Sequence, residues 1–291
     1  MYAVAVMPVL LAAGWRFGRG EVVRPVQLLL FLLAAVLLLA WENLANDVFD
    51  AETGVDAIGK PHSVVNLTGR PRRVAALANA CLLAGLGLMV LVAWRSNPEV
   101  LVLVLACCGL GYLYQGPPFR LGYRGLGEPL CWLAFGPLAT AAGLQALSPP
   151  AAAAVPWREA LLLGSGPALA TTLVLFCSHF HQVEEDAANG KRSPVVQLGS
   201  ARAAALVPWF VAGALALQWA PLLVAPGGQH WPPTALLGAV GLPPARQLIA
   251  LLRDHHQQAE LISGSKFLAL RFQALNGLGL AFGLALGRWW S

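Results

Sequence analysis

Charged residues are scarce in this chain. Asp, Glu, Lys and Arg make up 11% of its 291 residues, whereas an ordinary soluble domain carries roughly 25%. Apolar residues account for 57%, and the mean hydropathy is +0.64. Because so little charge could not cover a water-exposed surface, the composition excludes a water-soluble enzyme and indicates an integral membrane protein.

The chain also lacks paired cysteines. Its five cysteines are odd in number, form no C-x-x-C pair and lie in apolar stretches, at Cys81, Cys107, Cys108, Cys131 and Cys177. This pattern excludes a disulfide framework and a zinc site, so we interpret them as small buried hydrophobic residues. The net charge of +5 predicts no nucleic-acid partner, since membrane proteins carry extra Lys and Arg on their cytoplasmic side.

Long apolar runs predict about nine transmembrane helices in an all-α polytopic bundle, because a spanning helix needs ~20 mostly apolar residues. The first 15 residues lack a basic segment ahead of the apolar run, so we read them as a membrane helix and not as a signal peptide. Pro243 and Pro244 interrupt the eighth run, which makes it the weakest. The nine runs lie at 1–17, 25–45, 74–94, 99–115, 129–147, 159–180, 202–224, 232–252 and 266–290.

One face of this bundle is predicted to collect the polar residues. In a nine-helix chain the loops after helices 2, 4, 6 and 8 share a face, and that face holds 13 of the 19 basic and 11 of the 14 acidic residues. The basic residues place it in the cytoplasm. Orientation needs no carboxylates, however, so their gathering at the same face indicates polar chemistry there.

The first acidic motif ends the second helix. If that helix continues, Asn43, Asn46, Asp47 and Asp50 are spaced i, i+3, i+4 and i+7 and share one face. Stacked oxygen ligands suit a hard cation such as Mg²⁺, which also binds substrate phosphates. The alternative is a solvated helix end, but a helix C-terminus disfavours acids.

A second polar motif ends the sixth helix. His179, Gln182 and Asp186 are spaced i, i+3 and i+7, which predicts that they share a helix face. Asp50–Gly54 and Asp186–Gly190 both read D-A-x-x-G, which indicates an internal repeat whose two sites face each other. The histidines have an alternative role as hydrogen-bonded structural residues.

The loop between helices 4 and 5 brings aromatic and basic groups to the same face. Tyr114, Arg120, Tyr123 and Arg124 lie in a stretch that Gly and Pro keep out of a helix. Tyrosine rings and fixed cations suit an anionic ligand. The alternative is an aromatic belt at the membrane interface.

These motifs together resemble the UbiA-type membrane prenyltransferases, in the branch that acts on 1,4-dihydroxy-2-naphthoate. The resemblance lies in Asn46–Asp50 with Gly54 and Asp56, in 114–128, and in 177–199, and it covers nearly all of a single domain, 1–291. It implies transfer of a phytyl or other prenyl group from its diphosphate to 1,4-dihydroxy-2-naphthoate or its quinone form, with loss of CO₂ and diphosphate. Mg²⁺ is the implied cofactor, and membrane lipid surrounds the bundle.

The resemblance also implies roles for individual residues. The implied catalytic residues are Asp47, Asp50, Asp186 and Lys191, and the implied metal ligands are Asn46, Asp47, Asp50 and Asp186. The implied substrate-binding residues are Asn43, Asn46, Asp56, Tyr114, Arg120, Tyr123, Arg124, His179, His181, Gln182, Glu185 and Arg192. The chain departs from the family at Gln182, where members usually carry an Asp. Members also carry a polar segment before the position of Met1, so a longer N-terminus is expected.

Three alternative functions remain at this point. One is a menaquinone-type polyprenyltransferase with the same acceptor, because walls of Leu, Ala and Val accept tails of any length. A sibling enzyme for homogentisate or chlorophyllide would share the acidic motifs. An ion-coupled transporter would need charges near the membrane midplane, and helices 3, 4, 5, 7 and 9 carry almost none. The expected location is a cytoplasmic or thylakoid membrane of a cyanobacterium.

Overall fold

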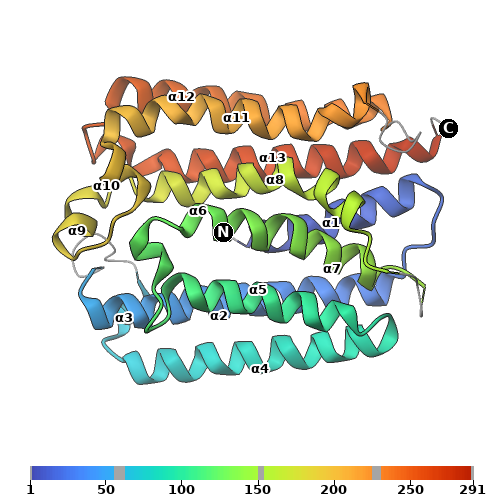
Figure 1. The fold of residues 1–291 in the computed structure, drawn as a ribbon, viewed down its shortest axis with the longest axis horizontal. Coiled ribbons are helices and arrows are strands. Elements are labelled where there is room, and N and C mark those ends of the chain that lie inside the picture. The colour runs from blue at the N-terminus through green and yellow to red at the C-terminus, as the bar shows by residue number, and fades with distance from the viewer. Residues whose placement is uncertain (1, 56–62, 150–153, 225–230, 290–291) are drawn as a thin grey trace.

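The fold is a bundle of roughly parallel helical rods (Figure 1). A computed structural model describes residues 2–55, 63–149, 154–224 and 231–289, and every regular element in those ranges is a helix, which confirms the predicted class. The long elements are α1 (Ala3–Gly18), α2 (Pro25–Thr53), α4 (Pro71–Arg95), α5 (Glu99–Gln115), α8 (Trp157–Ser178), α11 (Ser200–Leu223), α12 (Leu242–His255) and α13 (Ser265–Leu286).

Short elements join or extend these rods. They are α3 (Val64–Thr68), η1 (Leu121–Arg124), α6 (Gly127–Leu133), η2 (Ala134–Leu138), α7 (Ala139–Ala146), α9 (Val183–Ala188), α10 (Pro194–Leu198), η3 (Pro233–Gly241), η4 (Leu261–Gly264) and η5 (Gly287–Trp289). The elements α3, α9 and α10 lie together at one end of the bundle (Figure 1).

The apolar rods identify an integral membrane protein. In the part of the chain that the structure describes, six helices are long and apolar enough to cross a membrane, at Pro25–Thr53, Pro71–Arg95, Trp157–Ser178, Ser200–Leu223, Pro233–His255 and Leu261–Trp289. The helices α1 and α5 are apolar but shorter. Each predicted apolar run coincides with a helical rod, whereas the number of nine spans remains a prediction.

Proline explains where two of the predicted helices differ from the structure. The fifth run is not one α-helix, because Pro137 lies inside the π-helical turn η2, between α6 and α7. Proline lacks the N–H that a regular helix needs, and a π-turn absorbs the defect. The eighth run is helical from Pro233 onward, but it changes from the 3₁₀ helix η3 to α12 at Leu242. Pro243 and Pro244 lie in the first turn of α12, where a missing N–H costs no hydrogen bond.

Two hydrophobic cores hold the rods together, and α8 contributes to both. One core gathers residues of α1, α2, α4, α5, α7, α8 and α13. The other gathers residues of α8, α11, α12 and α13. The first core comes mainly from the first half of the chain and the second core from the second half. Because α8 and α13 contribute to both cores, these two helices join the two parts of the bundle.

Small residues let some helices touch backbone to backbone. A Cβ at Gly14 of α1 would collide with the carbonyl of Ala281 on α13, and one at Gly283 would collide with the carbonyl of Thr234 in η3. The Thr234 hydroxyl donates to the Gly283 carbonyl at 2.6 Å. Such close crossings are typical of membrane helices, where small residues permit dense packing.

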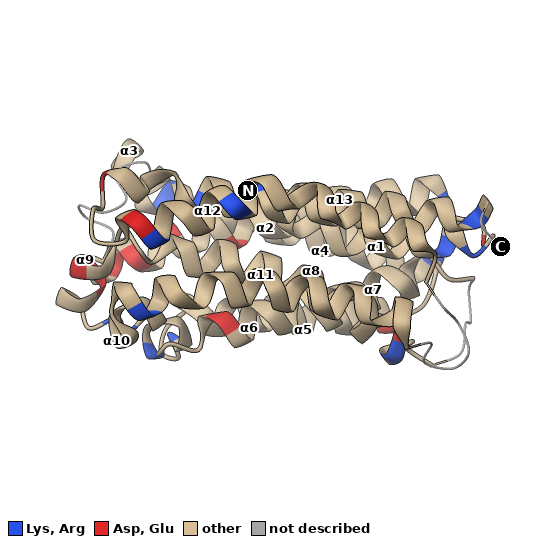
Figure 2. Ribbon diagram, turned by 90° about the horizontal axis from the view of Figure 1, so that it is seen from above, with Lys and Arg blue, Asp and Glu red and all other residues tan. Residues whose placement is uncertain are grey.

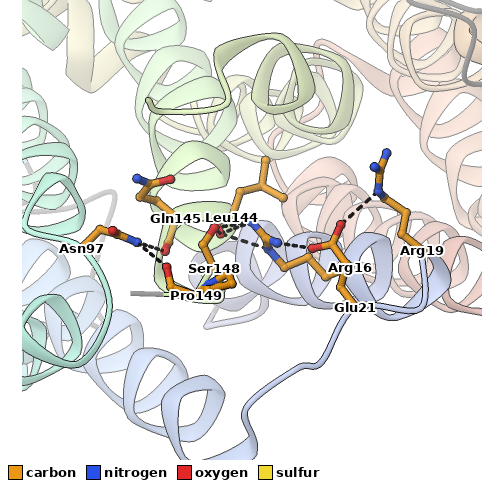
Figure 3. A network of polar contacts seen from close by, with 8 residues as sticks. All are labelled: Arg16, Arg19, Glu21, Asn97, Leu144, Gln145, Ser148 and Pro149. Carbon is orange, nitrogen blue, oxygen red and sulfur yellow. Dashed lines mark hydrogen bonds and ion pairs between the residues drawn. The ribbon is translucent and has the colours of Figure 1, made fainter. Parts of the chain in front are cut away.

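A polar network closes the end of the bundle opposite α9 (Figure 3). Arg16 donates to the Leu144 carbonyl at 2.8 and 3.0 Å and also contacts Ser148 and Glu21. Asn97 donates to the Gln145 carbonyl at 3.2 Å. The last carbonyls of a helix lack the usual backbone partners, and these side chains donate to two such carbonyls of α7.

The crossing of α1 and α13 gives a stability prediction. Gly14→Leu should destabilise the protein by about 1–3 kcal/mol, the usual cost of overpacking a tight contact, and should lower its melting temperature in detergent. Gly87→Leu is the matched control, because a Cβ at Gly87 of α4 meets nothing within 4 Å. Equal melting temperatures for the two variants would contradict the proposed backbone contact.

Candidate active site

Most charged residues lie toward the two ends of the bundle, with few in the helical segments between them (Figure 2). Most of the acidic residues lie at the end that carries α3 and α9 (Figure 2). The sequence predicted this gathering from the alternation of the loops, and the acidic motifs of α2 and α9 do meet there.

The first motif has the predicted geometry because α2 continues through Asp50 and ends at Gly54. Gly54 has a φ of 79°, a left-handed conformation that suits glycine. The four predicted residues all line one cavity: Asn43, Asn46, Asp47 and Asp50. The two aspartates are buried, with 7% and 4% of their surface exposed, so the shared helix face is confirmed and the solvated helix end is wrong.

Neutral donors surround both aspartates. Asp47 Oδ2 accepts a hydrogen bond from the Val64 backbone N–H at 2.8 Å, at the first turn of α3. Asp50 Oδ1 accepts from the Tyr123 hydroxyl at 3.1 Å and from the Gln115 side chain. Sequence reasoning missed Gln115, the last residue of α5, because nothing in its local sequence shows that it reaches α2.

The second motif does not lie on one continuous helix, as the spacing had predicted. The helix α8 ends at Ser178, and α9 begins only at Val183. Glu184, Glu185 and Asp186 occupy the first turn of α9, where the helix dipole favours acids that it would disfavour at the end of α8. The break nevertheless leaves His179 close to Asp186, with 3.5 Å between Nδ1 and Oδ2.

Asp186 forms the centre of a buried charge cluster. Its Oδ1 lies 3.3 Å from Lys191 Nζ, and His179 Nε2 lies 3.6 Å from Glu128 Oε1. Burial alone would raise the pKa of Asp186, but the adjoining imidazole of His179 and the positive charge of Lys191 outweigh it and lower that pKa. Asp186 is therefore an ionised carboxylate behind His179 and Lys191, which line the cavity.

Sequence reasoning placed Glu128 only at the end of a loop and gave it no role. The structure buries its carboxyl, whose two oxygens accept no hydrogen bond from the residues that the structure describes. An acid directly after the Gly-rich loop was the signal that could have identified it.

The loop after α5 packs its tyrosines against the site. Burial and the charge of Asp50 raise the pKa of Tyr123 above its usual value, so the phenol stays protonated and can donate to Asp50. Lys191 Nζ lies 5.8 Å from the centre of the same ring. The ring of Tyr114 fills the space over Gly122 and Gly127, where a Cβ would collide with it. These contacts favour a site over the alternative of an interfacial belt.

Several predicted residues lie outside the cavity wall. Arg120 forms an ion pair with Glu52 at 3.4 Å and has its guanidinium 5.8 Å from the Tyr123 ring. The side chains of Arg124 and Arg192 are exposed, and Glu185 is half-buried on α9. Asp56 lies outside the described residues. His181 and Gln182 do line the cavity.

The two D-A-x-x-G segments face each other, as the sequence echo predicted. A Cβ at Gly54 would lie 3.8 Å from the side-chain oxygen of Asn189, the residue before Gly190. Gly54 and Gly190 have φ values of 79° and 73°. Both segments therefore end in the same left-handed turn beside the cavity mouth.

The cavity has a polar mouth and an apolar interior. Its volume is about 720 Å³, within the range of roughly 300–1,000 Å³ that is usual for small-molecule sites. The polar mouth includes the α2 motif, His179 and Lys191, whereas the interior is lined by side chains such as Phe31, Leu38 and Phe135. This shape suits an amphiphilic ligand that has an anionic head and a long apolar tail.

The residues at the mouth fit a hard divalent cation. Asp47 and Asp50 offer carboxylates about one helical turn apart, and the contacts of Asp186 are longer than ordinary hydrogen bonds, which leaves lone pairs available. Among the described residues no three His, Cys, Asp or Glu side chains already form a metal cluster. The donors therefore suit an ion such as Mg²⁺ that keeps water or substrate oxygens among its ligands.

Fold and site together define a membrane enzyme for a lipid substrate with an anionic head group. The family model of the UbiA prenyltransferases matches residues 5–270, and the chain belongs to this family. A Synechocystis sp. protein named 2-carboxy-1,4-naphthoquinone phytyltransferase is 41% identical over 97% of this chain and 89% of its own length. The chloroplastic protein of that name from Arabidopsis thaliana is 38% identical over 99% of this chain and 75% of its own length.

Solved structures support the fold. A UbiA homolog from Archaeoglobus fulgidus, bound to GPP and Mg²⁺, superposes with a TM-score of 0.56 at 17% identity. The match covers 96% of this chain and 95% of that one. The resemblance seen in the motifs is thus confirmed at the level of the family.

The α2 motif predicts loss of activity on mutation. Asp47→Ala or Asp50→Ala should lower prenyl transfer at saturating Mg²⁺ by more than about 10-fold, because a charged ligand for the diphosphate-bound cation is lost. EDTA should inactivate the wild type, and added Mg²⁺ should restore it. Asp254→Asn is the control, since Asp254 pairs with Arg253 on the surface. Retention of a tenth of the activity would overturn the assignment.

The α9 motif gives a prediction with its control on the same helix. Asp186→Asn should raise the Mg²⁺ concentration for half-maximal rate by about 10–100-fold, as loss of a metal-supporting group usually does, whereas Glu184→Gln and Glu185→Gln should not. A normal Mg²⁺ requirement with a raised KM for the prenyl diphosphate would show instead that Asp186 only holds Lys191.

Proposed function

We propose that the protein transfers a phytyl group from phytyl diphosphate to 1,4-dihydroxy-2-naphthoate, with loss of diphosphate and CO₂. The observation that carries this proposal is the buried acidic mouth above a deep apolar cavity. The names of the Synechocystis and Arabidopsis relatives support the phytyl donor and a carboxylated naphthoquinone-type acceptor.

The mouth would bind the diphosphate, and the cavity would bind the tail. Asp47 and Asp50, with Asn46 and Asp186, would hold Mg²⁺, which would neutralise charge on the leaving diphosphate when bound. Lys191 faces the cavity and adds a fixed ammonium for the phosphate oxygens. The apolar helices then accommodate the tail without bringing it into water.

Bond cleavage creates an allylic cation and a diphosphate anion. The aromatic ring of Tyr114 borders the cavity near the mouth, where its face can stabilise the cation. Tyr123 keeps its proton and donates to Asp50, which holds that carboxylate in place. The enclosed apolar walls exclude water, which would otherwise capture the cation.

The acceptor ring then completes the reaction. The ring carbon that bears the carboxylate attacks the cation and forms the new carbon–carbon bond. The bond from that carbon to the carboxylate breaks, CO₂ leaves, and the bonding electrons restore the aromatic ring, so no strong base is needed. We propose that Arg120, beside the Tyr123 ring, draws the anionic acceptor to the mouth.

The charged residues at the acidic end bear on membrane orientation, and family membership bears on the competing functions. We propose that the acidic end faces the cytoplasm, because the basic residues predicted for the cytoplasmic loops surround it. Family membership favours prenyl transfer over ion-coupled transport. A menaquinone-type polyprenyl donor and a homogentisate or chlorophyllide acceptor remain as outcomes of the assay.

An assay with purified protein in detergent or nanodiscs tests the proposal. Phytyl diphosphate and 1,4-dihydroxy-2-naphthoate should yield a decarboxylated phytyl-naphthoquinol, read out by mass, whereas homogentisate and 4-hydroxybenzoate should yield at least about 100-fold less, because they lack the fused ring or the matching carboxylate. Efficient prenylation of either substitute would overturn the acceptor. Equal rates with long polyprenyl diphosphates would remove only the phytyl assignment.

A further inference from the structure

One acidic residue lies deeper than the mouth. Glu42 is on α2, five residues before Asp47, which places it about 7 Å further along the helix at a rise of ~1.5 Å per residue. It precedes Asn46 and Asp50 by four and eight residues, so the three follow one stripe of the helix. All three line the cavity, and Glu42 continues the polar stripe into the apolar interior.

The surroundings of Glu42 are apolar. Cys107, Cys108 and Cys131 lie near its carboxyl, and a Cβ at Gly111 would approach that carboxyl to 3.5 Å. Within residues 2–55, 63–149, 154–224 and 231–289, no side chain forms a hydrogen bond or ion pair with it. A membrane helix rarely retains an ionisable side chain without a functional partner.

The aspartates of the two motifs differ in this respect. Asp47 has the Val64 N–H, Asp50 has Tyr123, and Asp186 has Lys191. Glu42 therefore faces open cavity with unused acceptor oxygens. An unpaired polar group in such a place costs free energy unless a ligand donates a hydrogen bond to it.

The chemistry of each substrate group shows which of them can lie against the Glu42 carboxyl. A diphosphate oxygen would repel the carboxyl oxygens, and a hydrocarbon tail offers no donor. The acceptor of the proposed reaction carries hydroxyl groups, and its 4-hydroxyl is meta to the carboxylate, so the two substituents point in clearly different directions. With that carboxylate held toward Lys191 at the mouth, the 4-hydroxyl is directed away from the mouth, toward the interior that Glu42 lines.

We propose that Glu42 accepts a hydrogen bond from the 4-hydroxyl of the acceptor ring and so selects a 1,4-dihydroxy ring over one that lacks the 4-hydroxyl. This inference rests on the proposed function. Glu42 is thus a specificity-determining residue that orients the ring so that its carboxylated carbon meets the allylic cation.

The test compares two acceptors in three proteins. The acceptors are 1,4-dihydroxy-2-naphthoate and 1-hydroxy-2-naphthoate, which lacks only the 4-hydroxyl. The proteins are the wild type, Glu42→Leu and Glu42→Gln, with kcat/KM measured for each acceptor at saturating phytyl diphosphate. Because every comparison uses the same pair of acceptors, their different intrinsic reactivity cancels.

Glu42→Leu should lower kcat/KM for the dihydroxy acceptor by about 30-fold and for the monohydroxy acceptor by less than about 3-fold, since only the first loses a buried hydrogen bond. Glu42→Gln keeps a carbonyl acceptor and should give a smaller loss. The KM for phytyl diphosphate should stay unchanged. Both variants should melt no lower than the wild type, because an unpaired carboxyl has been removed.

Controls separate the possible failures. Glu99→Gln, at an exposed acid that begins α5, should leave both acceptors unaffected. Equal losses for both acceptors, or a raised KM for phytyl diphosphate in Glu42→Leu, would overturn the inference while the proposed function stands. Failure of the wild type to prenylate the dihydroxy acceptor would overturn the proposed function and this inference with it.

Discussion

Buried carboxylates at the end of an apolar bundle impose the main constraint on this structure. Asp47, Asp50 and Asp186 are all buried, and isolated charges in such a place would be expensive. Each carboxylate is held by a group outside its own helix: a backbone N–H of α3, a tyrosine of η1, and Lys191 after α9. The connecting segments at this end therefore fold around the acids, and the acids define the mouth of the cavity.

This constraint also explains the likeness between the two halves of the site. Each acidic segment needs a turn that reverses the chain without adding bulk, and Gly54 and Gly190 supply it with left-handed backbone. A Cβ at Gly54 would lie at an ordinary contact distance from the Asn189 side chain, so the left-handed backbone and not a lack of space is what favours glycine there. The segments thus converge on one mouth although 136 residues separate Asp50 from Asp186.

Local patterns in the sequence predicted most of the fold and the first half of the site. Apolar runs gave the rods, and the i, i+3, i+4, i+7 spacing gave the shared face of the α2 motif. The break between α8 and α9 was missed, because spacing alone cannot show that three acids prefer the start of a new helix. Gln115 and Glu128 were missed for another reason: their contacts with Asp50 and His179 join segments far apart in the chain.

The two ends of the bundle differ in how well their polar groups are paired. At the end opposite α9, Arg16 and Asn97 satisfy the carbonyls that close α7, which fixes the helices relative to one another. At the mouth, the oxygens of Glu128 accept no hydrogen bond from the described residues, and Asp186 has only long contacts with its two basic neighbours. Natural proteins leave such local conflicts where a ligand resolves them. Because the far end stabilises the bundle, the fold tolerates carboxylate oxygens at the mouth that lack close partners. Those oxygens are available to a cation, and the cation in turn can bind a diphosphate.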